Sequence, residues 1–220
     1  MIDIVCNIDE NYVEYCGVML SSLFVHNPQE AFKIHAINSN VTLSQKKRLS
    51  EFCQKFNTEI RFYDVDFSSI KDFPIKSKDH LSLAAYLRLF MGELLPNTID
   101  KVLYLDCDLM VVSSIKRIFL PIRWNIMDFF LFTKPLIQPR RIADLHTAID
   151  HPAIIHFTGK RKPWLHSCDS PYRNQYLALA RQYQWNVITW QESIRYYIRK
   201  VWYVTLTNIH LKHKRTISIK

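Results

Sequence analysis

Two aspartates, Asp106 and Asp108, lie within the apolar segment of residues 101–112, Lys-Val-Leu-Tyr-Leu-Asp-Cys-Asp-Leu-Met-Val-Val. Burying a carboxylate is strongly unfavourable unless a cation or hydrogen-bond donors compensate it. Side chains two positions apart point to the same side of an extended chain, so this segment predicts a strand that ends at a divalent ion. Oxygen ligands of this kind suit Mg²⁺ or Mn²⁺, which proteins often share with substrate phosphates. The alternative is a strand end that turns into a solvated loop.

Alternating strand-like and helix-like patterns indicate how these carboxylates are positioned. Strands are expected at residues 2–8, 32–38, 59–65 and 152–157, and helices at 13–26, 45–56 and 82–95. Thr42 or Ser44 is expected to cap the second helix. The β-α-β-α-β order is typical of a doubly wound parallel sheet, where ligands bind at the carboxyl ends of the strands. Both the Asp-Glu-Asn-Tyr segment at 9–12 and the Asp-Cys-Asp segment at 106–108 fall at such ends.

Composition and charge indicate a domain with its own core and an anionic partner. The 220 residues are 48% hydrophobic, which is enough for one domain with its own core, and the net charge of +9 favours an anionic partner. The five cysteines are scattered without a Cys-x-x-Cys pair, so we expect buried thiols in a reducing compartment and neither a disulfide framework nor a zinc site. Neither a signal peptide nor a transmembrane run is expected.

A basic loop follows the strand expected at residues 152–157. It reads Thr-Gly-Lys-Arg-Lys-Pro-Trp and contains Gly159, one of only three glycines in the chain. Glycine permits close approach of the backbone to a ligand, and the adjacent cations suit a diphosphate. The alternative interpretation is a polar turn.

The segment 181–220 is basic and rich in aromatic residues. It has eight lysines and arginines against one acid, Glu192, with tryptophans and tyrosines interleaved. Such a segment is a candidate for binding an anionic membrane surface, and an ordinary helix packed on the domain is an equal alternative. Nucleic-acid binding is not expected, because no recognised motif accompanies the charge.

Four blocks of this sequence together resemble glycosyltransferase family 8, the bacterial galactosyl- and glucosyltransferases of lipopolysaccharide synthesis related to glycogenin. The blocks are residues 4–12, 82–89, 101–108 and 156–164, in the order found in the family. The resemblance implies a GT-A type fold, a Rossmann-like and mostly parallel sheet flanked by helices. It also implies a UDP-galactose or UDP-glucose donor, Mn²⁺ or Mg²⁺ as cofactor, and retention of configuration.

The resemblance also assigns roles to residues. The implied metal ligands are Asp106, Asp108 and His156. The implied contacts of the nucleotide sugar, in addition to the two aspartates, are Asp9, Asn11 and Tyr12 for uracil and ribose, Arg88 for the sugar or its phosphate, and Gly159 and Lys162 for the diphosphate. The expected partner is a saccharide or glycolipid acceptor such as lipopolysaccharide core, and the expected location is cytoplasmic or peripheral on the inner face of the membrane.

One departure from the family pattern concerns the acceptor side. The family's Asn-(Ser/Ala)-Gly and Asp-Gln-Asp segments are absent between residues 108 and 156, and residues 120–125 resemble the strand that normally follows them. We therefore expect an internal deletion near 118–122 that truncates the centre of the domain. The expected organisation is a GT-A domain at 1–176 and a basic aromatic tail at 177–220. No catalytic residue is assigned.

Three hypotheses follow for function. The first is an active retaining glycosyltransferase, and the second is a UDP-binding remnant that has lost the acceptor segments, so that little or no transfer is expected from this chain alone. The third is a phosphatase of the haloacid dehalogenase type, whose strand also carries Asp-x-Asp. That class has Thr or Val two positions after the second Asp, where this chain has Met110, and the third hypothesis is disfavoured.

Overall fold

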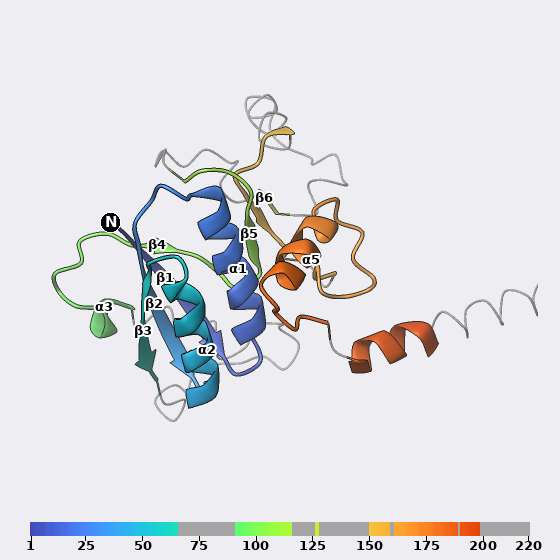
Figure 1. Ribbon diagram of the computed structural model, residues 1–220, viewed down its shortest axis with the longest axis horizontal. Coiled ribbons are helices and arrows are strands. Elements are labelled where there is room, and N and C mark those ends of the chain that lie inside the picture. The colour runs from blue at the N-terminus through green and yellow to red at the C-terminus, as the bar shows by residue number, and fades with distance from the viewer. Residues whose placement is uncertain (66–90, 116–125, 128–149, 159–160, 189, 199–220) are drawn as a thin grey trace, which may run out of the picture.

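The protein has an α/β fold built on a four-stranded parallel sheet (Figure 1). The computed structural model describes residues 1–65, 91–115, 126–127, 150–158, 161–188 and 190–198. The strands are β1 (Ile2–Asp9), β2 (Phe32–Ser39), β3 (Glu59–Asp64) and β4 (Leu103–Tyr104), in the order β3-β2-β1-β4. All three pairings are parallel, which confirms the expected sheet and brings the carboxyl ends of β1 and β4 together.

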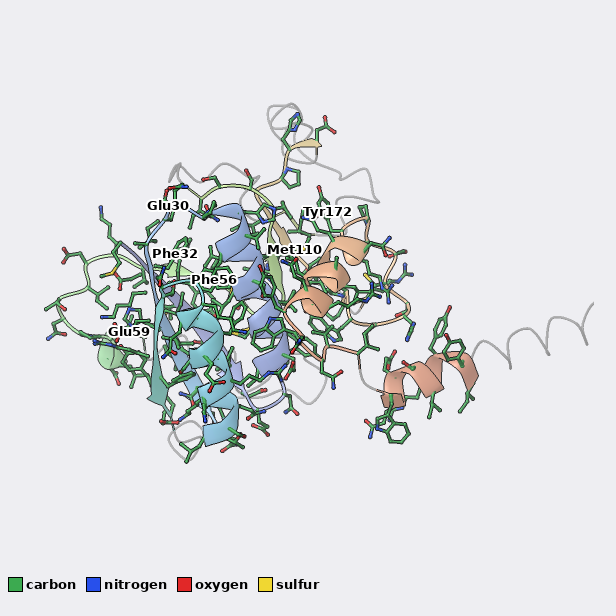
Figure 2. The ribbon with its side chains drawn as sticks, in the orientation of Figure 1. Glu30, Phe32, Phe56, Glu59, Met110 and Tyr172 are labelled. Atoms are coloured by element: carbon green, nitrogen blue, oxygen red, sulfur yellow. The ribbon has the colours of Figure 1, made fainter. Side chains whose placement is uncertain are left out.

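Helices α1 (Val13–His26) and α2 (Leu43–Gln54) cover one face of this sheet (Figure 1). Alternate residues of β1 face them and are fully buried with the apolar side chains of both helices in one core. Phe32 and Phe56 point into this core (Figure 2), where the ring of Phe24 lies 6.0 Å and 4.8 Å from theirs. Burial of this apolar face provides the main driving force that holds the helices on the sheet.

The start of α2 is fixed by a capping box, in which Thr42 is the N-cap residue. The Thr42 hydroxyl accepts a hydrogen bond from the backbone N–H of Gln45, and the Gln45 side chain accepts one from the backbone N–H of Thr42. Of the two candidate caps, Thr42 is therefore the one used. The side-chain amide of Gln45 also donates from Nε2 to the backbone carbonyl of Glu10, which connects α2 to the segment that follows β1.

A second, three-stranded sheet lies beside the first. It consists of β5 (Leu109–Val111), β7 (Ile154–His156) and β6 (Ile126–Met127), with β5 antiparallel and β6 parallel to β7. Side chains of α1 hold β5 in place, because the hydroxyl of Ser22 accepts a hydrogen bond from the backbone N–H of Val111.

The strand expected within residues 101–112 forms as two short strands, and the first of them, β4, ends at Tyr104, two residues before Asp106. The apolar run crosses from the first sheet to the second, so its two halves pair as β4 and β5 in different sheets. Asp106 and Asp108 lie in the connection between them. The residues of β4 and of β5 are both apolar because each strand packs in a core. In the sequence, two short apolar strands joined in this way look the same as one long strand.

Helix α5 (Arg173–Gln182) and the residues just after it pack on α1. This helix runs across the expected boundary at 176–177, and Trp185 and Val187 beyond it are buried in the main core. The division into a domain at 1–176 and a tail at 177–220 stays a proposal, and the burial of Trp185 and Val187 shows that the first part of that tail packs with the domain core. Helix α3 (Met91–Leu94) is the described part of the helix expected over 82–95. All five cysteines are buried, as expected.

Candidate metal and nucleotide-sugar site

The connection between β4 and β5 presents two carboxylates at one surface. Leu105, Cys107 and Leu109 are buried, so the alternating side chains of Asp106 and Asp108 are directed outward. The backbone N–H of Leu105 donates to the carbonyl of Val5 at 2.9 Å, which fixes the segment against β1. The carboxylates remain partly shielded from water, with 28% and 17% of their side-chain surfaces exposed.

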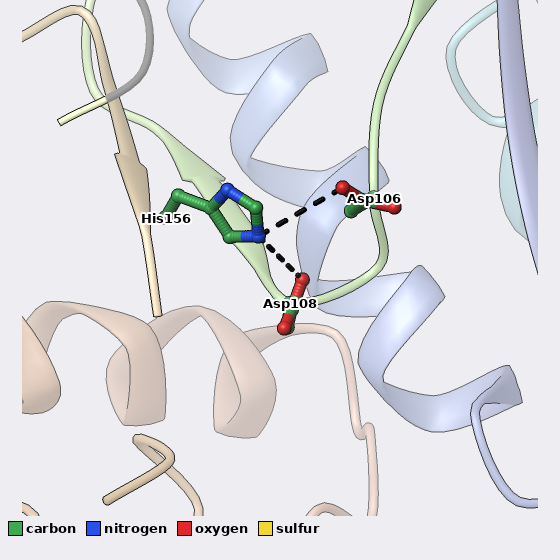
Figure 3. A group of neighbouring side chains, drawn as sticks. All are labelled: Asp106, Asp108 and His156. Atoms are coloured by element: carbon green, nitrogen blue, oxygen red, sulfur yellow. Dashed lines mark ion pairs between the residues drawn. The ribbon is translucent and has the colours of Figure 1, made fainter. Parts of the chain in front are cut away.

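His156 at the end of β7 completes a cluster with these aspartates (Figure 3). Antiparallel pairing places His156 opposite Leu109, next to Asp108. Its Nε2 lies 3.2 Å from Oδ1 of Asp108 and 3.8 Å from Oδ2 of Asp106, and one ligand atom from each residue lies within 4.8 Å of the others. Two carboxylates and one imidazole form a donor set that fits a divalent ion such as Mn²⁺.

Lys162 also binds Asp108. Its ammonium donates to Oδ2 of Asp108 at 2.6 Å and to the backbone carbonyl of Phe157. Burial by itself would raise the pKa of Asp108, but the hydrogen bond from His156 and the charge of Lys162 outweigh it and hold that pKa below its usual range. Asp108 is therefore an anion at neutral pH, the form in which a carboxylate binds a metal ion.

The segment between β1 and α1 forms the neighbouring edge of the site. Oδ1 of Asp9 accepts hydrogen bonds from the backbone N–H groups of Asn11 at 2.9 Å and Tyr12 at 3.1 Å. Burial raises the pKa of Tyr12 to about 12, with further contributions from the charges of Asp108 and Asp9. The phenol is therefore neutral near pH 7 and able to donate a hydrogen bond.

The segment between β1 and α1 lies beside the Asp-Cys-Asp connection at residues 106–108. The thiol of Cys107 donates to the backbone carbonyl of Asn7 at 3.2 Å, and this hydrogen bond joins the Asp-Cys-Asp connection to the end of β1. The structure thus brings together six of the expected residues, namely Asp9, Asn11, Tyr12, Asp106, Asp108 and His156, with Lys162 at the same cluster. The predictions for Arg88 and Gly159 fall outside the described residues.

Three aromatic residues beside the predicted site residues were not predicted, namely Tyr104, Tyr15 and Trp164. The hydroxyl of Tyr104 donates to Oδ1 of Asp106 at 2.8 Å, which orients that carboxylate. The ring of Tyr15 stacks on Trp164 at 3.7 Å and meets Tyr12 edge-on at 5.3 Å. Tyr104 precedes Asp106 by two positions, so the same alternation that paired the aspartates could have indicated it.

Solved structures with the same architecture are transferases. The crystal structure of galactosyltransferase LgtC in complex with donor and acceptor sugar analogues aligns with a TM-score of 0.69 and 18% identity, over 82% of this chain and 96% of that chain. The glycosyltransferase GlyE of Streptococcus pneumoniae TIGR4 aligns with a TM-score of 0.53 and 15% identity, over 82% of this chain and 61% of that chain. The fold is of the GT-A glycosyltransferase type.

Sequence comparison then assigns the family: the chain belongs to glycosyltransferase family 8, whose profile matches residues 3–122. General stress protein A of Bacillus subtilis is 32% identical over 112 residues, which are 50% of this chain and 38% of that protein. Lipopolysaccharide 1,3-galactosyltransferase of Salmonella typhimurium is 28% identical over 116 residues, 53% of this chain and 34% of that protein. The matched region thus spans little more than a third of each of these relatives.

Proposed function

We propose that this chain carries the nucleotide-sugar site of a metal-dependent retaining glycosyltransferase that uses UDP-galactose or UDP-glucose. The proposal is carried by the convergence of Asp106 and Asp108, in the connection between β4 and β5, with His156 at the end of β7, because these ligands come from two separate parts of the sequence. Membership in family 8 supports it independently. Mn²⁺ is the proposed ion, with Mg²⁺ as the alternative.

The residues of the site have complementary proposed roles. A bound divalent ion would supply positive charge to the diphosphate as the glycosidic bond to the leaving UDP breaks. Lys162 would bind the same diphosphate, and Gly159 would allow the backbone to approach it. Asp9, Asn11 and Tyr12 would bind uracil and ribose, since they form the adjacent strand end, and Arg88 would bind the sugar or its phosphate.

The proposed acceptor is a saccharide or glycolipid, such as the core of lipopolysaccharide. Support comes from the similar protein of Salmonella typhimurium, which is a lipopolysaccharide 1,3-galactosyltransferase. The acceptor side is also where the chain departs from the family pattern.

The second candidate function is UDP-sugar binding with little or no transfer, and the missing acceptor segments favour it. The two candidates are separated by incubating the protein with Mn²⁺, each UDP-hexose and a saccharide acceptor, and measuring release of UDP. We expect rates far below the usual range of about 1–1,000 per second for enzymes. A transfer rate within that range would contradict the hypothesis of a UDP-binding remnant and would establish an active glycosyltransferase.

We also propose that the tail binds an anionic membrane surface. Residues 190–198 are helical, and their large apolar side chains Trp190, Ile194, Tyr197 and Ile198 recur on one face and are 46–70% exposed. The opposite side contacts the domain, where His166 stacks on Tyr196 at 4.7 Å. Among the described residues, no helix has the length and hydropathy needed to span a membrane. The proposed association is peripheral, at the anionic inner face.

Replacing Trp190 and Ile194 with serine is expected to weaken binding to phosphatidylglycerol-containing vesicles at least about tenfold, because each buried apolar side chain contributes roughly 1.5–3 kcal/mol. Vesicle flotation measures the effect. Leu43→Ser is the matched control, since Leu43 is 84% exposed but lies on α2. Equal binding of the double variant and the wild type would refute the proposed surface.

A further inference from the structure

Lys162 engages the same carboxylate that the metal site requires. The two oxygens of Asp108 have different partners, with Oδ1 lying 3.2 Å from Nε2 of His156 and Oδ2 accepting the hydrogen bond from the Lys162 ammonium. Only 20% of the Lys162 side chain and 17% of the Asp108 side chain are exposed, so water screens this pair weakly. The positive charge of Lys162 thus lies within the cluster itself.

A divalent ion bound by the two aspartates and His156 would lie a few ångströms from this ammonium. Like charges at that distance in a partly buried site repel strongly, so the two cations cannot both be bound by Asp108 without loss of affinity. Lysine has a flexible four-carbon stem, which allows the ammonium to move while the backbone stays in place. The neighbouring Arg161 differs, because it pairs with the exposed Asp169 and not with the cluster.

We propose that Lys162 is a displaceable internal cation, which competes with the divalent ion for Asp108 and is released by that ion to bind the donor diphosphate. This inference rests on the proposed function of the site. It makes metal binding and donor binding cooperative, and by linkage Mn²⁺ and UDP raise each other's affinity by the same factor.

The competing explanation is that Lys162 is a structural clamp. It also donates to the carbonyl of Phe157, whose backbone N–H donates to the carbonyl of Asp108 at 3.1 Å. A clamp would hold the end of β7 against the start of β5, and its removal would loosen the cluster. The two explanations therefore predict opposite signs for the effect of removing Lys162 on Mn²⁺ affinity.

Titration with Mn²⁺ in the absence of nucleotide tests this sign, with free Mn²⁺ measured by electron paramagnetic resonance. Lys162→Met keeps an unbranched apolar stem and is expected to bind Mn²⁺ about tenfold more tightly than the wild type, because the charge-assisted hydrogen bond that competes is lost. Arg161→Met, which removes a cation from the same loop, is expected to change the affinity less than about twofold. Unchanged or weaker Mn²⁺ binding by Lys162→Met would overturn the inference.

Two further measurements complete the test. With saturating Mn²⁺, Lys162→Met is expected to bind UDP more weakly than the wild type, so that the same substitution has opposite effects on the two ligands. Lys162→Gln removes the charge but keeps a donor for the Phe157 carbonyl, and it serves in place of the Met variant if that variant does not fold. It should also bind Mn²⁺ more tightly and UDP more weakly than the wild type. Failure of the folded wild-type protein to bind Mn²⁺ would instead overturn the proposed metal site itself, together with this inference.

Discussion

Asp108→Ala is expected to abolish Mn²⁺-dependent UDP binding, with a loss of affinity greater than about 100-fold. Loss of residues that only support a metal ligand already weakens metal binding about 10- to 100-fold, and Asp108 is itself a proposed ligand. The substitution also removes the carboxylate that Lys162 and His156 share, which leaves Asp106 as the one aspartate of the cluster. Calorimetric titration with UDP at saturating Mn²⁺ measures the effect.

Asp169→Ala is the matched control for that experiment. Asp169 is also a carboxylate paired with a cation of the basic loop, but its partner is Arg161 and its side chain is 55% exposed. Exposed ion pairs contribute little, so UDP affinity should stay at the wild-type value. If Asp108→Ala bound UDP as tightly as this control, the assignment of Asp108 to the metal would be wrong.

Gly17→Ala is expected to destabilise the protein by about 2 kcal/mol or more, although alanine favours helices. A Cβ atom at Gly17 would lie 2.3–2.6 Å from ring atoms of Trp185, closer than van der Waals contact allows. Helix propensity would stabilise the variant by about 1 kcal/mol, but expulsion of a buried tryptophan destabilises by roughly 3–5 kcal/mol. The steric term is therefore larger, and denaturant unfolding monitored by tryptophan fluorescence measures the difference.

Trp185 cannot shift without losing other contacts. Its Nε1 donates to the hydroxyl of Ser21 at 3.0 Å, and its ring packs edge-on to Phe52 at 4.9 Å. Gly92→Ala is the control, because a Cβ added at Gly92 in α3 meets no atom of the described residues within 4 Å. We expect that variant to be neutral or slightly stabilised, and equal stabilities for the two variants would contradict the packing of Trp185 on α1.

The first half of the fold could be predicted because its signals are local. Strand and helix patterns alternate through the first 65 residues, and the parallel pairing of β1, β2 and β3 follows from the intervening helices. The same rule placed the segment at residues 9–12 beside the acidic segment at 106–108, at the carboxyl ends of neighbouring strands. That part of the site is thus a consequence of topology.

The remaining features depend on contacts between residues far apart in sequence. Gly17 and Trp185 are 168 positions apart, and nothing in the helical pattern of α1 indicates that an indole occupies the space above the glycine. Likewise, the crossing of residues 101–112 between two sheets requires β7 as a partner for β5. The position of His156 beside Asp108 was expected from the family resemblance, and the antiparallel register of β5 and β7 gives its physical cause.

The most direct test of the proposed site is calorimetric titration of the folded protein with UDP, with and without Mn²⁺. The cluster formed by Asp106, Asp108 and His156 predicts UDP binding that requires Mn²⁺. Binding of equal affinity with and without the ion, or no binding by a folded sample, would contradict a metal-dependent nucleotide-sugar site.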